Sequence, residues 1–163
     1  MRKITVFLTV LILMSMSSEV IIKLRRTYYK ALKNEKSIET FFNLGEKHQK
    51  TALGKAYFGT AKALKARESS WVPTKVSLAN EASGLLNNAV KQDPKSTEIR
   101  FLRLSFESAT PSMLGINEHV QDDIDFLSTH LEKKHPIKHI ISAWLAKTDD
   151  ISESALNRIK ARL

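Results

Sequence analysis

The fold is decided by residues 50–94, which read KTALGKAYFGTAKALKARESSWVPTKVSLANEASGLLNNAVKQDP. Apolar or small residues recur every three or four positions on both sides of the segment 68–72, which is the spacing of one face of an α-helix. They are Leu53, Ala56, Tyr57, Thr60 and Leu64 in the first part, and Val76, Ala79, Ala82, Leu86, Ala89 and Val90 in the second. Pro73 favours a helix start, and Asp93-Pro94 favours a stop. The stretch predicts a helical hairpin.

The same periodicity predicts helices over most of the remaining chain, and no segment alternates as a strand does. Expected helices cover 18–33, 37–45, 96–108, 117–134 and 137–145, with a last one after 150. Ser37 and Asn117 are expected N-caps, Gly45 is expected to end the second helix, and Asp150 with Glu153 has the spacing of a capping box. The predicted fold is all-α, with eight helices in stacked antiparallel hairpins. A non-repeating helical bundle is the alternative.

Leu53-Gly54-Lys55-Ala56-Tyr57 resembles the Leu-Gly-x-x-Tyr signature of the tetratricopeptide repeat. The residues that carry the resemblance are Leu53, Gly54, Tyr57, Ala82, Leu86, Ala89 and Pro94. The resemblance implies a short α-solenoid in which the small residues let helices approach and Tyr57 and Leu86 fill the space between pairs. It covers one unit, and 25 residues separate Tyr57 from Ala82 where the family has nine. The extra residues imply longer helices or a longer loop.

A second resemblance rests on Glu98-Ile99-Arg100-Phe101-Leu102-Arg103, followed by Pro111-Ser112-Met113-Leu114-Gly115-Ile116-Asn117 and Asp123. These segments are similar to a family of small exported helical proteins of Gram-negative bacteria that has no assigned activity. The resemblance implies a periplasmic location.

The N-terminus predicts export. Arg2 and Lys3 precede a mostly apolar run over 4–14, and Ser15-Met16-Ser17-Ser18 follows. A basic start, an apolar centre and small residues are typical of a signal peptide, so residues 1–17 are the expected signal and 18–163 one helical domain. An uncleaved membrane tether is the alternative, because apolar residues resume at Val20-Ile21-Ile22 after Glu19. The 163 residues contain no cysteine, so packing must hold the fold without disulfides.

The net charge of +9 is concentrated in the N-terminal half. Residues 18–75 contain 13 Lys and Arg against 5 Asp and Glu, whereas 76–163 contain 11 against 12. Lys23, Arg26, Lys30 and Lys33 form a basic stripe on the first helix. Such a stripe is commonly the solvated face of a helix. The alternative interpretations are that it contacts an anionic membrane surface or an acidic protein. Export argues against nucleic acid as the partner.

No catalytic motif for nucleophilic, zinc or phosphoryl chemistry occurs in the sequence. His130, His135 and His139 lie close in sequence, but Pro136 interrupts their spacing and a metal site is not predicted. Acid–base pairs of Glu46 with His48, or of His119 with Asp122 and Asp123, would be chance neighbours on solvated helices. We therefore expect a protein that is not an enzyme and needs no cofactor.

The expected function is an exported protein–protein interaction scaffold, and the alternative is a membrane-associated protein held by its N-terminal segment and its basic helix. In a repeat stack the first helices of the pairs line a concave face. The expected contact residues are Lys55, Arg100, Arg103, Met113 and Leu114. One predicted loop contains the apolar residues Met113, Leu114 and Ile116, and it either folds over the core or forms an exposed apolar patch. The same two interpretations apply to Trp71 and Val72.

Overall fold

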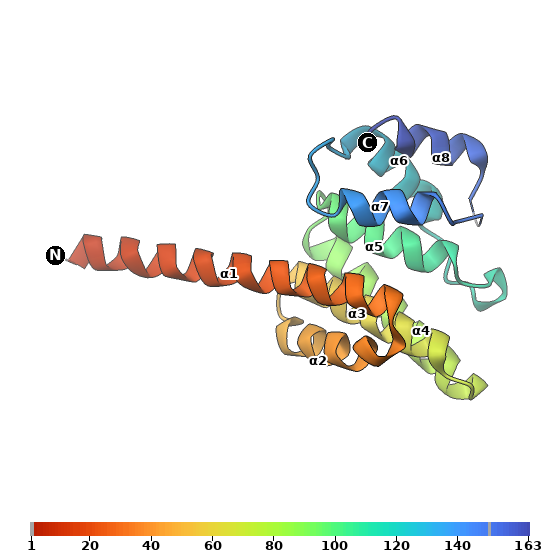
Figure 1. The fold of residues 1–163 in the computed structure, drawn as a ribbon, viewed down its shortest axis with the longest axis horizontal. Coiled ribbons are helices and arrows are strands. Elements are labelled where there is room, and N and C mark those ends of the chain that lie inside the picture. The colour runs from red at the N-terminus through yellow and green to blue at the C-terminus, as the bar shows by residue number, and fades with distance from the viewer. Residues whose placement is uncertain (1, 150) are drawn as a thin grey trace.

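The computed structural model describes residues 2–149 and 151–163, and the described chain is all-helical, without a strand. Its eight α-helices follow one another with two short 3₁₀ turns between them (Figure 1). The α-helices are α1 (Arg2–Lys33), α2 (Ile38–His48), α3 (Ala52–Glu68), α4 (Val72–Gln92), α5 (Thr97–Ser108), α6 (Val120–His130), α7 (Lys138–Leu145) and α8 (Glu153–Lys160). The 3₁₀ turns are η1 (Glu35–Ser37) and η2 (Ser112–Leu114). The predicted all-α class is confirmed.

Helices α3 and α5 lie inside the stack. Helix α3 contacts α1, α2, α4 and α5, and α5 contacts α3, α4 and α6. Eight of the twelve residues of α5 are buried, including Phe101, Leu102 and Leu104, none of which has any exposed surface. This arrangement explains why α5 is apolar on more than one side, as its sequence indicates. From α1 to α6 each helix packs against the next one in sequence, and α7 packs against α8, as is typical of a helical bundle or a short solenoid.

The residues of the repeat-like motif pack along α3 and α4. Gly54, Tyr57, Ala82, Leu86 and Ala89 are buried, Leu53 is half-buried, and Pro94 is exposed in the turn before α5. The wide spacing between Tyr57 and Ala82 is taken up by long helices, because α3 has 17 residues and α4 has 21 while only three residues connect them.

Glycines set how closely the helices around α3 approach. A Cβ added at Gly45 would lie 2.9 Å from the Cα of Phe58, and one added at Gly59 would lie 3.1 Å from the carbonyl oxygen of Ala82. Gly54, expected to bring two helices of a hairpin together, instead faces the His48 carbonyl oxygen, 2.0 Å from its added Cβ. The prediction that Gly45 ends the second helix is wrong: α2 continues to His48, and Gly45 instead allows the close approach of α2 to α3 at Phe58.

The helix caps agree with the sequence in part. Ser96 accepts a hydrogen bond from the Ile99 amide, and Pro73 lies in the first turn of α4, as predicted. Ser37 holds the N-cap position of α2, as predicted, but its side chain makes no capping hydrogen bond. The predicted cap at Asn117 is wrong, because α6 begins after His119 and the Asn117 amide donates to the carbonyl oxygens of Glu107 and Thr110 at the end of α5.

The last helix begins two residues later than the predicted capping box of Asp150 and Glu153 requires. Asp150 lies outside the described residues, and the Ser152 side chain caps α8 by accepting a hydrogen bond from the Ala155 amide. Helix α6 also ends earlier than expected, at His130, because Leu131 takes an extended backbone.

Helix α1 continues through the predicted cleavage point after residue 17 or 18. Its N-terminal half projects away from the other helices, and its C-terminal half packs beside them (Figure 1). The packed half contributes Leu24, Tyr28 and Ala31 to the core, with 1 to 3% of their surface exposed. The prediction of a signal peptide at 1–17 depends on residues whose side chains lie outside the described ones. Within the part of the chain whose side chains are described, no helix has the length and apolar character needed to cross a membrane.

We expect the protein to lose stability at alkaline pH because two core tyrosines are buried in their neutral form. Burial raises the pKa of Tyr28 to about 12 and that of Tyr57 well above its usual value of 10. An unfolded tyrosine ionises near pH 10, so stability is fully present below pH 10 and falls as the pH rises toward 12. Tyr28 alone should account for roughly 2 kcal/mol over that interval. Urea unfolding at successive pH values measures the loss, and Tyr28→Phe should flatten it. An unchanged free energy of unfolding between pH 9 and 11.5 would contradict the burial of these hydroxyls.

Candidate functional site: the α2–α4 groove

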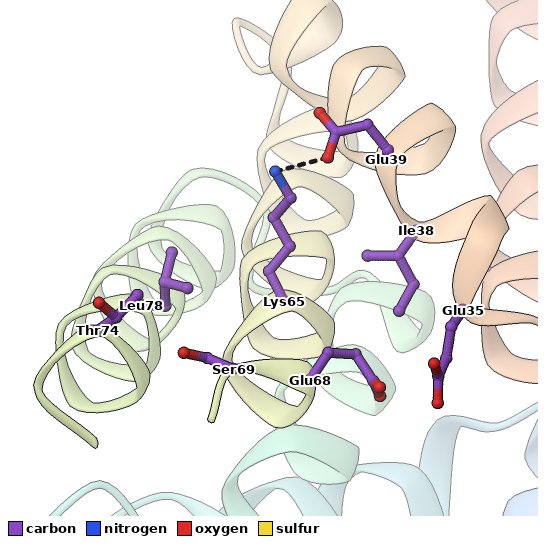
Figure 2. A pocket seen from close by; sticks show the side chains of 8 residues that line it. All are labelled: Glu35, Ile38, Glu39, Lys65, Glu68, Ser69, Thr74 and Leu78. Carbon is purple, nitrogen blue, oxygen red and sulfur yellow. Dashed lines mark ion pairs between the residues drawn. The ribbon is translucent and has the colours of Figure 1, made fainter. Parts of the chain in front are cut away.

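A groove runs between α2 and α4, and α3 forms its floor. Its cavity volume is about 400 Å³. It is lined by Glu35, Ile38, Glu39, Lys65, Glu68, Ser69, Thr74 and Leu78. Figure 2 shows Lys65 rising from α3 between Glu39 and Ile38 of α2 on one side and Thr74 and Leu78 of α4 on the other. Three successive helices therefore enclose one surface depression.

The groove combines apolar walls with fixed charges. Ile38 is buried and Leu78 is half-buried, so both contribute apolar surface. The Lys65 ammonium lies 2.8 Å from a Glu39 carboxylate oxygen and 3.9 Å from the centre of the Phe42 ring. The ion pair and the cation–π contact together hold the ammonium at the edge of the depression. Such a surface fits a partner that offers both an apolar side chain and polar groups.

Two exposed apolar residues lie at the start of α4, close in sequence to residues that line the groove. Trp71 and Val72 are 67% and 66% exposed, and they lie between the lining residues Ser69 and Thr74. Of the two interpretations that the sequence left open, folding over the core is contradicted, because both side chains are exposed. Large side chains of this kind, adjacent to a depression, are typical of surfaces that bind another protein.

The Glu68 carboxylate, which also lines the groove, is held in its ionised form. Arg67 donates a hydrogen bond to its carboxylate at 2.8 Å, and this contact is the largest cause of a lowered Glu68 pKa. The carboxyl is therefore ionised at neutral pH, and the groove presents a negative group beside the apolar walls.

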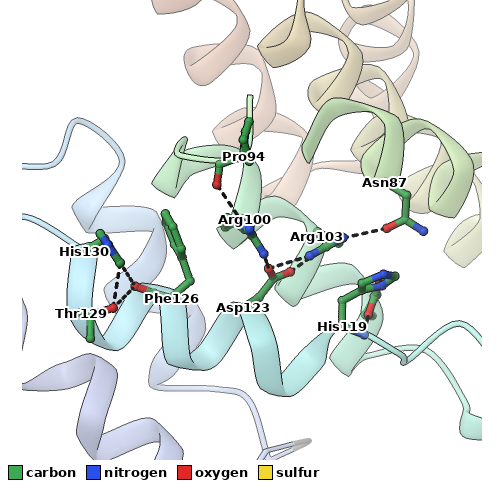
Figure 3. A network of polar contacts seen from close by, with 10 residues as sticks. Asn87, Pro94, Arg100, Arg103, His119, Asp123, Phe126, Thr129 and His130 are labelled. Atoms are coloured by element: carbon green, nitrogen blue, oxygen red, sulfur yellow. Dashed lines mark hydrogen bonds and ion pairs between the residues drawn. The ribbon is translucent and has the colours of Figure 1, made fainter. Parts of the chain in front are cut away.

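The predicted contact residues on the first helices are not all available. Arg103 was expected to be exposed, but its side chain is buried, and the expectation is wrong. Its Nε donates to Asp123 Oδ2 at 2.7 Å, its Nη2 to Asp123 Oδ1 at 2.8 Å, and its Nη1 to Asn87 Oδ1 at 3.0 Å (Figure 3). Arg100 also donates to Asp123, at 2.9 Å. Asp123, expected to face solvent, is fully buried between these two arginines.

Lys55 is half-buried on α3 and has no ion pair with any described residue. Because α3 and α5 lie inside the stack, they do not form the open concave face that was expected of the first helices. The open depression instead lies between α2 and α4, which are second helices of their pairs.

The loop that contains η2 is partly folded over the core and partly exposed. Ile116 is 7% exposed and Leu114 is half-buried against the core, so these residues fold back as expected. Met113 is 89% exposed. Gly115 ends η2 with a φ of 64°, in the left-handed region that glycine adopts without strain. The predicted patch is reduced to Met113.

Two further charged residues of α5 are buried against other helices. Glu98 accepts hydrogen bonds from Arg25 of α1 and, at 2.5 Å, from the Tyr57 hydroxyl of α3. Glu107 lies 3.0 Å from His119 Nδ1 and accepts the His119 amide at 2.9 Å. His119 therefore pairs with Glu107, and neither Asp122 nor Asp123 is its partner. These contacts join α5 to α1, α3 and the start of α6, which is a structural role.

The three clustered histidines lie in separate environments. His130 stacks on the Phe126 ring, with 4.2 Å between ring centres, and the His139 ring lies 5.2 Å from that of Tyr29. His135 is half-buried, and burial lowers its pKa. No group of three or more metal-binding side chains forms within the described residues.

No protein-family model, curated protein or solved structure matches the chain. The groove itself was missed by sequence reasoning, because its lining residues come from three helices whose relative position the periodicity does not determine. The exposed apolar pair Trp71-Val72 was the one sequence signal that lay beside it.

Proposed function

We propose that the chain is an exported, periplasmic scaffold of the tetratricopeptide-like type, which binds a partner protein and carries out no covalent chemistry. The observation that supports this proposal most strongly is the α2–α4 groove, with Ile38 and Leu78 as apolar walls and with Trp71 and Val72 exposed beside it. Interfaces use large apolar anchors surrounded by polar groups. Lys65 and Glu39 supply such groups at the edge of the groove.

Site-specific photo-crosslinking in the native host tests the proposal. A photoreactive residue at Thr74, which is exposed and lines the groove, should give one discrete crosslinked product. The matched control is Asn88, an exposed position on the same helix that does not line the groove. Equal crosslinking at the two positions, or none at Thr74, would contradict a partner in the groove.

The membrane-tethered form is the second candidate, and the continuity of α1 favours it. Signal peptidase would have to cut within a helix that runs from Arg2 to Lys33. The intact mass of the protein from its host distinguishes the two. Loss of about 17 residues supports the released form. An intact N-terminus in the membrane fraction supports the tether.

A further inference from the structure

The packed half of α1 has two different sides. Leu24, Tyr28 and Ala31 face the core. Lys23, Arg26, Lys30 and Lys33 are exposed, and we call these four residues the basic face. Among the described residues no carboxylate lies within ion-pair distance of any of the four, although the Lys33 ammonium lies 4.1 Å from the centre of the Tyr29 ring. Arg25, the remaining cation of this half, is occupied by Glu98. The fold therefore pairs none of these four cations with a carboxylate among the described residues.

The position of the basic face along α1 points to its partner. The helix is continuous from Arg2, and the sequence preceding Lys23 contains the mostly apolar run 4–14 and the apolar residues Val20-Ile21-Ile22. At a rise of 1.5 Å per residue, Lys23 lies roughly 2 Å beyond Ile22 along the axis, Arg26 roughly 6 Å and Lys30 roughly 12 Å. The side chain of Ile22 is itself 53% exposed. Cations thus follow an apolar segment within a distance comparable to the thickness of a lipid headgroup layer.

We infer that the basic face binds the anionic headgroups of a phospholipid bilayer. Each cation close to an anionic membrane surface contributes about 1 kcal/mol, and the attraction declines within a Debye length of about 8 Å in physiological salt. Lys23 and Arg26 lie within that distance of the apolar boundary, and Lys30 lies just outside it. The contact shares no residue with the α2–α4 groove. It rests on the membrane-associated candidate and specifies the lipid chemistry that the basic face recognises.

Vesicle flotation of the full chain tests the inference. The chain is mixed with vesicles of phosphatidylcholine alone, or with vesicles in which about a quarter of the lipid is phosphatidylglycerol. Binding through the apolar segment should be equally strong for both kinds of vesicle. The ratio of the two affinities therefore measures the contribution of the basic face. At low salt the wild-type chain should bind the anionic vesicles about 25- to 100-fold more tightly, which corresponds to two or three cations at about fivefold each. High salt should remove the preference.

The variant Lys23→Gln/Arg26→Gln/Lys30→Gln should bind both kinds of vesicle equally, and its melting temperature should match that of the wild type because these side chains are exposed. The matched control Lys75→Gln/Lys147→Gln/Lys160→Gln removes the same charge from exposed positions outside α1 and should keep the preference. The inference is overturned if the wild type shows no preference for anionic vesicles. It is also overturned if the two triple variants behave alike. Preference for an acidic protein over anionic vesicles would assign the face to a protein partner.

Discussion

Replacing Asp123 with alanine should destabilise the protein by about 3 to 5 kcal/mol. Its carboxylate is fully buried and accepts hydrogen bonds from Arg103 on both oxygens, at 2.7 and 2.8 Å, and from Arg100 at 2.9 Å (Figure 3). Removal of the carboxylate leaves the Arg103 guanidinium buried with Asn87 as its remaining side-chain partner. An uncompensated buried charge is what makes such a change costly. Urea unfolding monitored by circular dichroism measures the difference.

Asp125→Ala is the control for this prediction. Asp125 lies on the same helix and pairs with Arg158 at 2.7 Å, but both side chains are about half exposed. Solvent screens such a pair, so the unfolding midpoint should hardly change. The double variant Arg103→Met/Asp123→Leu should recover most of the stability lost in Asp123→Ala, because apolar residues replace both buried charges. If Asp123→Ala and Asp125→Ala have similar effects, Asp123 is not buried as described.

Replacing Phe101 with alanine should also destabilise the protein by about 3 to 5 kcal/mol. Phe101 has no exposed surface, and its ring meets Trp144 of α7 edge to face, with 5.6 Å between ring centres. The truncation leaves a cavity between α5 and α7, and an aromatic contact is lost as well. For a protein whose total stability is typically about 5 to 15 kcal/mol, this change approaches the unfolding threshold. Thermal and urea unfolding measure it.

Met113→Ala is the control for Phe101→Ala. Met113 is 89% exposed in the loop that contains η2, so its truncation should change the free energy of unfolding by no more than about 0.5 kcal/mol. A comparable loss of stability in both variants would show that the loop, and not α5, bears the packing between the two halves of the chain.

Helix periodicity predicted the fold class and most helices, because burial of one face leaves a regular trace in the sequence. The ends of α3, α4 and α5 were also predicted within two residues, since Pro73, Asp93-Pro94 and Ser96 act locally. The errors at Gly45 and Asn117 have a different origin. Both residues are typical of helix ends, but each is used in a contact with a distant segment, Phe58 in one case and the end of α5 in the other.

The charged residues were harder to place than the apolar ones. Arg103 and Asp123 are 20 positions apart, and nothing in a single sequence shows that they form a buried pair. Charged side chains are mostly exposed, so the sequence favoured an exposed Arg103, and that expectation is wrong. The groove depends on the relative positions of three helices. Contacts that form only in the folded chain, such as that of Gly45 with Phe58, determine those positions.

The most direct test of the central claim, that a partner occupies the α2–α4 groove, is the affinity of the crosslinked partner for a variant with the groove filled. Thr74→Trp places a large ring in the cavity of about 400 Å³ without removing a core contact, because Thr74 is exposed. Asn88→Trp adds the same ring elsewhere on α4. Calorimetric titration should give at least a tenfold weaker affinity, or about 1.4 kcal/mol, for Thr74→Trp and an unchanged affinity for Asn88→Trp. Equal affinities for the two variants would contradict the claim.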